Sequence, residues 1–241
     1  MNLVIDIGNT VTKLAVFSSE EICFNKNYDS LTIVDIQELM NKFNIVNSII
    51  SEVKSFDSQV EELLAQHTKL IKLTPELKFP FKNLYRTPQT LGKDRYALVA
   101  AASGLNNNVL IIDAGTCVTY DFLDEHKNYY GGAISPGLNM RLKALNQFTG
   151  KLPEIEMNEQ EQPQLIGDST ENSIKSGVFN GLKQELQGVI NQYLQQYKNL
   201  KIVLTGGNIE RFDLEPKNRI FADKFFVLKG LNKILKLNAK D

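Results

Sequence analysis

Apolar and polar positions alternate in many short segments of this chain, and in other segments the apolar positions recur every three or four residues. The first pattern predicts β-strands and the second predicts amphipathic helices. A hairpin is expected within residues 3–17. Further strands are expected at residues 21–27, 48–51, 69–73, 109–113, 118–123, 129–134, 201–204 and 219–228. Helices are expected at residues 35–43, 57–67, 93–103, 170–197 and 229–237, with another that begins at Pro136, and a proline-containing loop is expected at residues 75–88.

One sequence pattern occurs twice. Residues 3–17 are LVIDIGNTVTKLAVF and residues 110–122 are LIIDAGTCVTYDF, so that Asp6, Gly8, Val11 and Thr12 match Asp113, Gly115, Val118 and Thr119. Each copy predicts a hairpin with an Asp-x-Gly turn. Glycine lets the backbone approach an oxyanion, turn N–H groups and Thr or Asn side chains donate to phosphate oxygens, and the Asp can hold a cation. Two copies in register favour phosphate binding over the alternative of ordinary hairpin turns.

Length and charge limit the possible classes of protein. A chain of 241 residues fits two domains, at residues 1–106 and 107–241, with the polar run at 106–108 as a turn between them. Its 27 basic and 28 acidic residues do not suggest bulk attraction to nucleic acid or to an anionic membrane. We expect a soluble cytoplasmic protein, because there is no secretory signal and no apolar run of ~20 residues. Cys23 and Cys117 are too few and too far apart for a disulfide framework or a zinc site.

A Gly-Lys-Asp-Arg segment at residues 92–95 precedes a small-residue helix. The helix N-terminus favours a negative charge on Asp94, which suits a group that accepts a proton. Arg95 offers a planar fork that can bind a carboxylate in a bidentate pair. The alternative is an Asp that caps the helix beside a solvated Arg.

Three more segments are compatible with ligand binding or with plain turns. Residues 131–137 and residues 205–208 are rich in glycine and follow predicted strands, so either could let a ligand approach the backbone. Asp168 and Glu171 have capping-box spacing at the start of the longest helix, which makes capping the expected role of Asp168 and leaves Thr170 free to face a ligand. The apolar stripe of that helix fits a core or a dimer interface.

The duplicated three-strand pattern followed by helices and strands resembles the two-lobed fold of actin, sugar kinases and chaperone ATPases. That resemblance implies an α/β fold of duplicated ribonuclease H-like domains, each a mixed five-stranded sheet with flanking helices, and a nucleotide cleft between the lobes. The ordered motifs at residues 6–13, 92–95, 113–116, 131–137 and 205–208 resemble type III pantothenate kinase over nearly the whole chain.

The resemblance implies ATP-dependent phosphorylation of pantothenate to 4'-phosphopantothenate, the first step of coenzyme A biosynthesis. It also implies Mg²⁺ with the ATP, a monovalent cation (K⁺ or NH₄⁺) and a homodimer without nucleic-acid or membrane partners. Asp94 would be the general base, Asp113 would bind the monovalent cation and Asp6 the Mg²⁺. The other site residues implied are Asp6, Ile7, Gly8, Asn9, Thr10, Val11, Thr12, Lys13 and Thr116 for ATP; Tyr85, Gly92, Lys93, Asp94, Arg95 and, across the dimer interface, Thr170 for pantothenate; and Gly206, Gly207 and Asn208 beside the adenosine.

Two positions depart from the family pattern, and two other functions stay open. Lys93 occupies a position that is usually small or aliphatic, where it could steer the carboxylate substrate or, as we expect, point to solvent. Cys117 is expected to be a small packing residue. The alternatives are a nucleotide-binding transcriptional accessory protein of the same fold, and a kinase or phosphohydrolase that acts on another small molecule.

Overall fold

The computed structural model describes residues 1–53, 57–158 and 160–239. The chain divides into two compact units. The first contains residues 1–105, residues 127–129 and the chain from Phe225 onward, and the second contains residues 106–126 and 130–224. Compared with a single division after residue 106, the C-terminal helix and residues 127–129 join the first unit.

The first unit is built on a five-stranded sheet with the order β3-β2-β1-β4-β5. Strands β1 to β3 are antiparallel neighbours, whereas β4 runs parallel to both β1 and β5, so the sheet is mixed. The strands are β1 (Asn2–Ile7), β2 (Thr12–Ser18), β3 (Glu21–Tyr28), β4 (Asn47–Glu52) and β5 (Lys69–Lys72).

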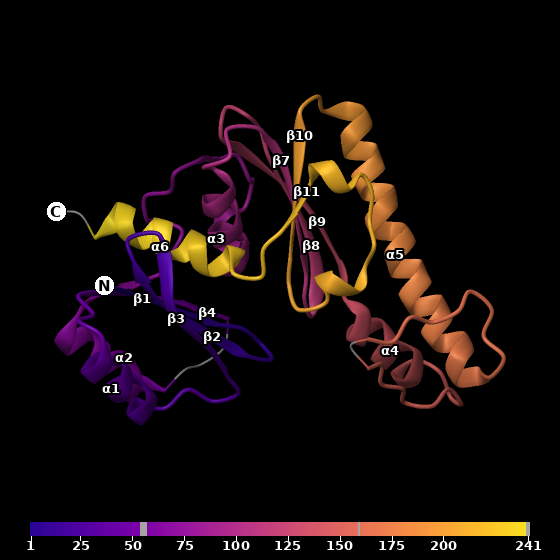
Figure 1. Ribbon diagram of the computed structural model, residues 1–241, viewed down its shortest axis with the longest axis horizontal. Coiled ribbons are helices and arrows are strands. Elements are labelled where there is room, and N and C mark those ends of the chain that lie inside the picture. Colours follow the sequence, from indigo (N-terminus) through magenta and orange to yellow (C-terminus); the bar gives the residue numbers. More distant parts are fainter. Residues whose placement is uncertain (54–56, 159, 240–241) are drawn as a thin grey trace. The chain divides into compact units, whose positions relative to one another are not determined.

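Helices cover both faces of this sheet. Leu3, Ile5 and Ile7 of β1 form a core with α1 (Ile33–Lys42) and α2 (Ser58–His67), which lie next to each other on one side of the sheet in Figure 1. Successive residues of a strand point to opposite faces, so Asp6 points to the other face. That face is covered by α6 (Phe226–Asn238), which contacts β1, β2 and β4.

The packing of α6 against α3 (Lys93–Ala102) explains why the C-terminal helix belongs to the first unit. A Cβ atom on Gly230 would lie 1.8 Å from the carbonyl oxygen of Ala97, so the two helix backbones can approach this closely only because Gly230 has no side chain. Asn232, which is fully buried, also ties α6 to the sheet through hydrogen bonds with Asn2 and with the carbonyl of Ser19.

The second unit repeats the topology of the first. Its strands have the order β11-β10-β7-β8-β9, which corresponds to β5-β4-β1-β2-β3 read from the other edge. The strands are β7 (Asn108–Ala114), β8 (Cys117–Leu123), β9 (Asn128–Pro136), β10 (Leu200–Thr205) and β11 (Ile220–Ala222). Leu110, Ile112 and Ala114 pack in one core with the long helix α5 (Thr170–Gln196) and with α4 (Leu138–Gln147). The predicted α/β class with two mixed sheets and flanking helices is therefore confirmed.

Several local predictions were wrong. Pro136 ends β9 instead of starting a helix, and Gly137 is the N-cap of α4. Ser169, not Asp168, caps α5: its Oγ accepts from the backbone N–H of Asn172 at 3.1 Å, while Asp168 accepts from the Asn172 side chain. The strand expected at residues 219–228 is limited to β11, because the chain enters α6 at Phe226.

The loop expected at residues 75–88 contains the two-residue strand β6 (Lys82–Asn83), which pairs with Asn128 and Tyr129. Three short 3₁₀ helices complete the structure: η1 (Pro88–Thr90), η2 (Ile209–Arg211) and η3 (Lys217–Arg219). In the part of the chain that the structure describes, no helix combines the length and the apolar composition needed to cross a membrane.

Candidate active site

The turn between β1 and β2 carries the first copy of the duplicated motif. The N–H of Gly8 donates to the carbonyl of Val11 at 3.2 Å, which closes the turn and leaves Asn9 and Thr10 exposed at its tip. Asp6 lies at the base of the turn and is only 8% exposed. In the register of the sheet, Asp6 lies opposite Lys13 on β2 and opposite Ser51 on β4. The hairpin therefore combines exposed polar donors with a buried carboxylate.

Charge at the base of this hairpin is only partly balanced. The pKa of Asp6 is raised to about 6, chiefly by burial; among the smaller effects the ammonium of Lys13 lowers it, the carboxylate of Asp94 raises it and a hydrogen bond with Ser51 lowers it. Asp94 lies in the first turn of α3, so the first hairpin and the 92–95 segment lie within electrostatic reach of each other. Two carboxylates near one ammonium favour a bound cation.

Asp94 is held in a defined orientation by the first turn of α3. Its Oδ1 accepts from the N–H of Arg95 at 2.8 Å. A Cβ on Gly92, the N-cap residue, would lie 2.5 Å from the same oxygen. Gly92 therefore leaves room for the Asp94 carboxylate in this orientation, which is a contact within the chain.

Arg95 is buried against an aromatic ring, so the alternative of a solvated Arg is wrong. Its residue exposure is 4%, and the guanidinium carbon lies 5.5 Å from the ring centroid of Tyr85. Lys93 is neither buried nor free in solvent. Its side chain is 33% exposed and its Nζ lies 3.9 Å from Glu52 Oε1, a carboxylate that also pairs with Lys72.

The second hairpin differs from the first in the length of its turn. Ile7 pairs with Thr12 across residues 8–11, whereas Ala114 pairs with Val118 across residues 115–117. The second turn is thus one residue shorter, and Thr119 is the partner of Asp113, as Lys13 is of Asp6. The alignment of Thr12 with Thr119 is therefore shifted by one position, and the second hairpin has a hydroxyl where the first has an ammonium.

Carboxylate and carbonyl oxygens of the second hairpin lie close to two glycines. Gly206 has φ 98°, and a Cβ there would lie 2.5 Å from Asp113 Oδ1 and 2.6 Å from the carbonyl oxygen of Ala114. A Cβ on Gly137 would lie 2.3 Å from the carbonyl oxygen of Gly115 and 2.5 Å from that of Thr116. A carboxylate together with backbone carbonyls is the donor set that suits a hard or monovalent cation.

The glycine-dense passage at residues 131–137 approaches its own chain. A Cβ on Gly132 would lie 1.8 Å from the carbonyl oxygen of Tyr120 on β8. Arg141, which is ion-paired with Glu185, donates to the carbonyl of Pro136 at 2.8 Å and to Ser135 Oγ at 2.9 Å. This network holds residues 131–137 against the second hairpin. The glycines of this segment therefore allow close packing within the chain.

The described residues include no group of three or more His, Cys, Asp or Glu side chains that could hold a metal. Mg²⁺ that arrives with a nucleotide usually uses one or two carboxylates plus phosphate oxygens and water. Asp6 can supply the carboxylate in the first unit. Asp113 and the nearby carbonyls fit a monovalent cation in the second.

The predicted site residues fall into two groups. The first unit brings together Asp6, Lys13, Asp94, Arg95 and Tyr85. The second unit brings Asp113 beside Gly206, and the N–H of Asn208 donates to the carbonyl of Ala114 at 3.2 Å. The predicted residues of the first unit are Asp6, Ile7, Gly8, Asn9, Thr10, Val11, Thr12, Lys13, Tyr85, Gly92, Lys93, Asp94 and Arg95; those of the second are Asp113, Thr116, Thr170, Gly206, Gly207 and Asn208.

Residues next to this site escaped prediction from sequence. Ser51 is fully buried beside Asp6, and its only signal was a polar residue that ends an apolar strand. Tyr129 stacks on Tyr85 from a distant part of the chain, and no local pattern indicated that contact. Thr170, the first residue of α5, is exposed.

Comparison with known proteins identifies the family. A family model described as type III pantothenate kinase matches residues 2–192. Type III pantothenate kinases from Christiangramia forsetii and Phocaeicola vulgatus are 47% and 44% identical to this chain, with 99% and 100% of each chain covered.

Solved structures show the same fold at low sequence identity. A protein from Campylobacter jejuni assigned to the Baf family of transcriptional activators superposes with a TM-score of 0.57 at 23% identity, and 98% of each chain is covered. The ethanolamine utilization protein EutJ from Carboxydothermus hydrogenoformans gives 0.52 at 14% identity over 98% of this chain and 89% of that one. On the family model and the full-length relatives, the chain belongs to the type III pantothenate kinase family.

Proposed function

We propose that this protein transfers the γ-phosphoryl group of ATP to the primary hydroxyl of pantothenate and forms 4'-phosphopantothenate, the first step of coenzyme A biosynthesis. The observation that carries the proposal is the placement of Asp94. Its carboxylate is held by the N–H of Arg95 in the space left by Gly92, and it lies within electrostatic reach of Asp6.

The first hairpin would bind the phosphates of ATP. Asn9 and Thr10 are exposed at its tip, where side-chain and backbone donors suit phosphate oxygens. Lys13 adds a positive charge near Asp6. Mg²⁺ bound with the nucleotide would neutralise charge on the phosphates, and Asp6 is the carboxylate in place to hold it.

Asp94 would accept the proton of the attacking hydroxyl, and Arg95 would bind the carboxylate of pantothenate. Phosphoryl transfer needs mainly in-line positioning and charge stabilisation, so a fixed carboxylate that orients the hydroxyl is the group the chemistry requires. A planar guanidinium buried against Tyr85 is suited to bidentate carboxylate binding.

In the second unit, Asp113 would hold the monovalent cation, K⁺ or NH₄⁺, and Thr116 would contact ATP. Gly206, Gly207 and Asn208 would lie beside the adenosine. The proposal includes a homodimer in which Thr170 completes the pantothenate pocket of the partner, and a cytoplasmic location. A role as a transcriptional accessory protein is not favoured, because the full-length relatives are type III pantothenate kinases.

The test is ADP release measured with pantothenate, with other small alcohols and without an acceptor. We expect pantothenate-dependent release, with product mass that confirms one added phosphoryl group. Release without any acceptor would indicate a phosphohydrolase, and turnover of a different alcohol would indicate a related kinase. No turnover under any condition would contradict an enzymatic role.

A further inference from the structure

Two tyrosine rings and a guanidinium form a continuous stack in the first unit. The rings of Tyr85 and Tyr129 have centroids 6.2 Å apart and an interplanar angle of 20°. The guanidinium carbon of Arg95 lies 5.5 Å from the centroid of Tyr85. Tyr85 thus contacts both groups, and its orientation decides where the guanidinium can lie.

Tyr129 is itself rigidly held. Its residue exposure is 0%, and the ring of Phe81 packs edge-on against it at 5.9 Å and 76°. Its backbone carbonyl accepts from the N–H of Leu84 at 2.9 Å in the pairing of β6 with β9. A fully buried ring with fixed neighbours can act as a platform for the half-buried Tyr85.

Asn83 fixes the backbone of Tyr85 to the helix that carries Asp94. Its Oδ1 accepts from the N–H of Tyr85 at 2.9 Å, and its Nδ2 donates to the hydroxyl of Tyr96 at 3.3 Å. Tyr96, on α3, donates to the carbonyl of Pro88 at 2.9 Å. The segment at residues 83–88 is therefore attached to α3 at two points.

We propose that Tyr129 and Asn83 are positioning residues for carboxylate recognition: they orient Tyr85 over Arg95 and so set the preference for an acceptor that carries a carboxylate. The proposal rests on the proposed function, in which Arg95 binds the carboxylate of pantothenate. A bidentate pair depends strongly on the orientation of the guanidinium plane, and a side chain that is already ordered loses less entropy on binding.

A positioning role differs from a purely structural role in what it changes. Loss of core packing lowers the stability of the fold and reduces activity toward every acceptor. Loss of the orientation of Arg95 reduces activity only toward acceptors with a carboxylate. Pantothenol, in which a hydroxymethyl group replaces that carboxylate, keeps the same primary alcohol and separates the two effects.

The experiment compares kcat/KM for pantothenate and for pantothenol in the full-length wild type, Tyr129→Leu, Tyr129→Phe and Phe24→Leu. We expect Tyr129→Leu to reduce kcat/KM for pantothenate about tenfold, with KM for ATP and kcat/KM for pantothenol changed less than about twofold. Tyr129→Phe keeps the stacked ring and should resemble the wild type. Phe24→Leu truncates an aromatic side chain of the same unit that packs on Phe43, away from Tyr85 and Tyr129, and should keep the wild-type ratio of the two acceptors.

An equal loss toward both acceptors in Tyr129→Leu, or the same change of ratio in Phe24→Leu, would overturn the proposal. If Tyr129→Leu does not fold, Asn83→Ala provides the decision, because Asn83 is half-buried and its loss leaves no large cavity. In Asn83→Ala, the ratio of kcat/KM for pantothenate to kcat/KM for pantothenol should fall about threefold. An unchanged ratio would overturn the positioning role of Tyr129 and Asn83. A wild type that turns over other alcohols but not pantothenate would instead contradict the proposed function, and with it this inference.

Discussion

Single residues set the geometry of the candidate site residues within each unit, and two of them act by having no side chain. Gly92 leaves room for the carboxylate of Asp94, and Gly206 leaves room for that of Asp113. The sequence identified both glycines as site residues, but it indicated contact with a ligand. The structure shows that their closest neighbours are carboxylates of the same chain.

Replacement of Asp94 by Asn tests the proposed general base at this scale. Asn keeps the shape and can still accept the hydrogen bond from the N–H of Arg95, but it cannot take up a proton. We expect kcat to fall by ~10²- to 10⁴-fold with little change in the affinity for ATP. Steady-state kinetics and calorimetric titration with an ATP analogue measure the two quantities, and turnover close to that of the wild type would remove Asp94 from the mechanism.

At the level of elements, the two hairpins have the same topology but different chemistry. Lys13 faces Asp6 in the first, and Thr119 faces Asp113 in the second. The sequence predicted the duplication and the strands, because alternation and the Asp-x-Gly turns are local signals. The sequence comparison matched Thr12 with Thr119, whereas in the structure Thr119 corresponds to Lys13. An alignment without gaps cannot reveal that one turn is a residue shorter.

Gly206→Ala tests the proposed cation site of the second hairpin. The new Cβ would crowd Asp113 Oδ1 and the carbonyl of Ala114 at a positive φ that L-residues rarely adopt. We expect activity to need about tenfold more potassium, because both oxygens must move away from the cation. Initial rates across a potassium titration, with sodium to keep ionic strength constant, provide the measurement.

Gly150→Ala is the matched control, since nothing lies within 4 Å of a Cβ there, and it should keep the wild-type potassium dependence. Equal wild-type activity in potassium and in sodium would contradict the presence of a selective cation site at Asp113.

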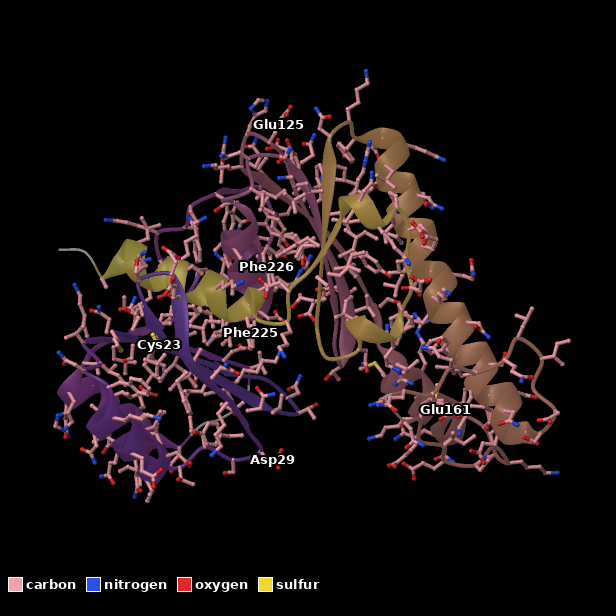
Figure 2. All side chains as sticks on the ribbon, in the orientation of Figure 1. Cys23, Asp29, Glu125, Glu161, Phe225 and Phe226 are labelled. Atoms are coloured by element: carbon pink, nitrogen blue, oxygen red, sulfur yellow. The ribbon has the colours of Figure 1, made fainter. Side chains whose placement is uncertain are left out.

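Long-range ion pairs also attach a loop to α5. Figure 2 shows Glu161 beside the N-terminal half of that helix, where its Oε1 lies 2.9 Å from Lys175 Nζ. The hydrogen bond from Lys175 is the largest cause that lowers the pKa of Glu161 below its ordinary value of 4.5. A lowered pKa in the folded state means that the pair stabilises the fold above about pH 4.5 and loses this effect as the pH falls.

We therefore expect Glu161→Gln to lower the free energy of unfolding by about 1 kcal/mol at pH 7 and by almost nothing near pH 3. Urea denaturation at the two pH values measures the difference. Glu171 is the other partner of Lys175, and its side chain is 59% exposed. Glu171→Gln should therefore lower the free energy of unfolding at pH 7 by less than Glu161→Gln does. Equal losses for Glu161→Gln at both pH values would show that charge is not the cause.

At the scale of the whole molecule, the sequence predicted the fold because its duplicated strands and its ordered motifs extend over most of the chain. Three features were beyond its reach. The two-residue strand β6 has no periodicity, Ser169 competes with Asp168 as a cap, and the return of α6 to the first unit depends on the contact of Gly230 with Ala97. Each is decided by packing between segments distant in sequence, which no local pattern reports.

Whether one chain is sufficient for activity is also a property of the whole molecule. Thr170 is exposed at the start of α5, in a second unit whose surface also exposes Phe148, Leu165 and Ile166 by more than four-fifths. If Thr170 completes the pocket of a partner subunit, Asp94→Asn and Thr170→Arg should each be inactive alone and should complement each other when mixed.

In a mixed dimer, one site would carry both defects and the other site neither. Random reassortment makes half of the dimers mixed, so the mixture should recover about a quarter of the wild-type activity. The measurement is the rate after unfolding and refolding the two variants together, with light scattering to establish that dimers have formed. Recovery with monomers only, or dimers without recovery, would show that Thr170 does not act across subunits, because complementation requires both intact residues to meet at one site.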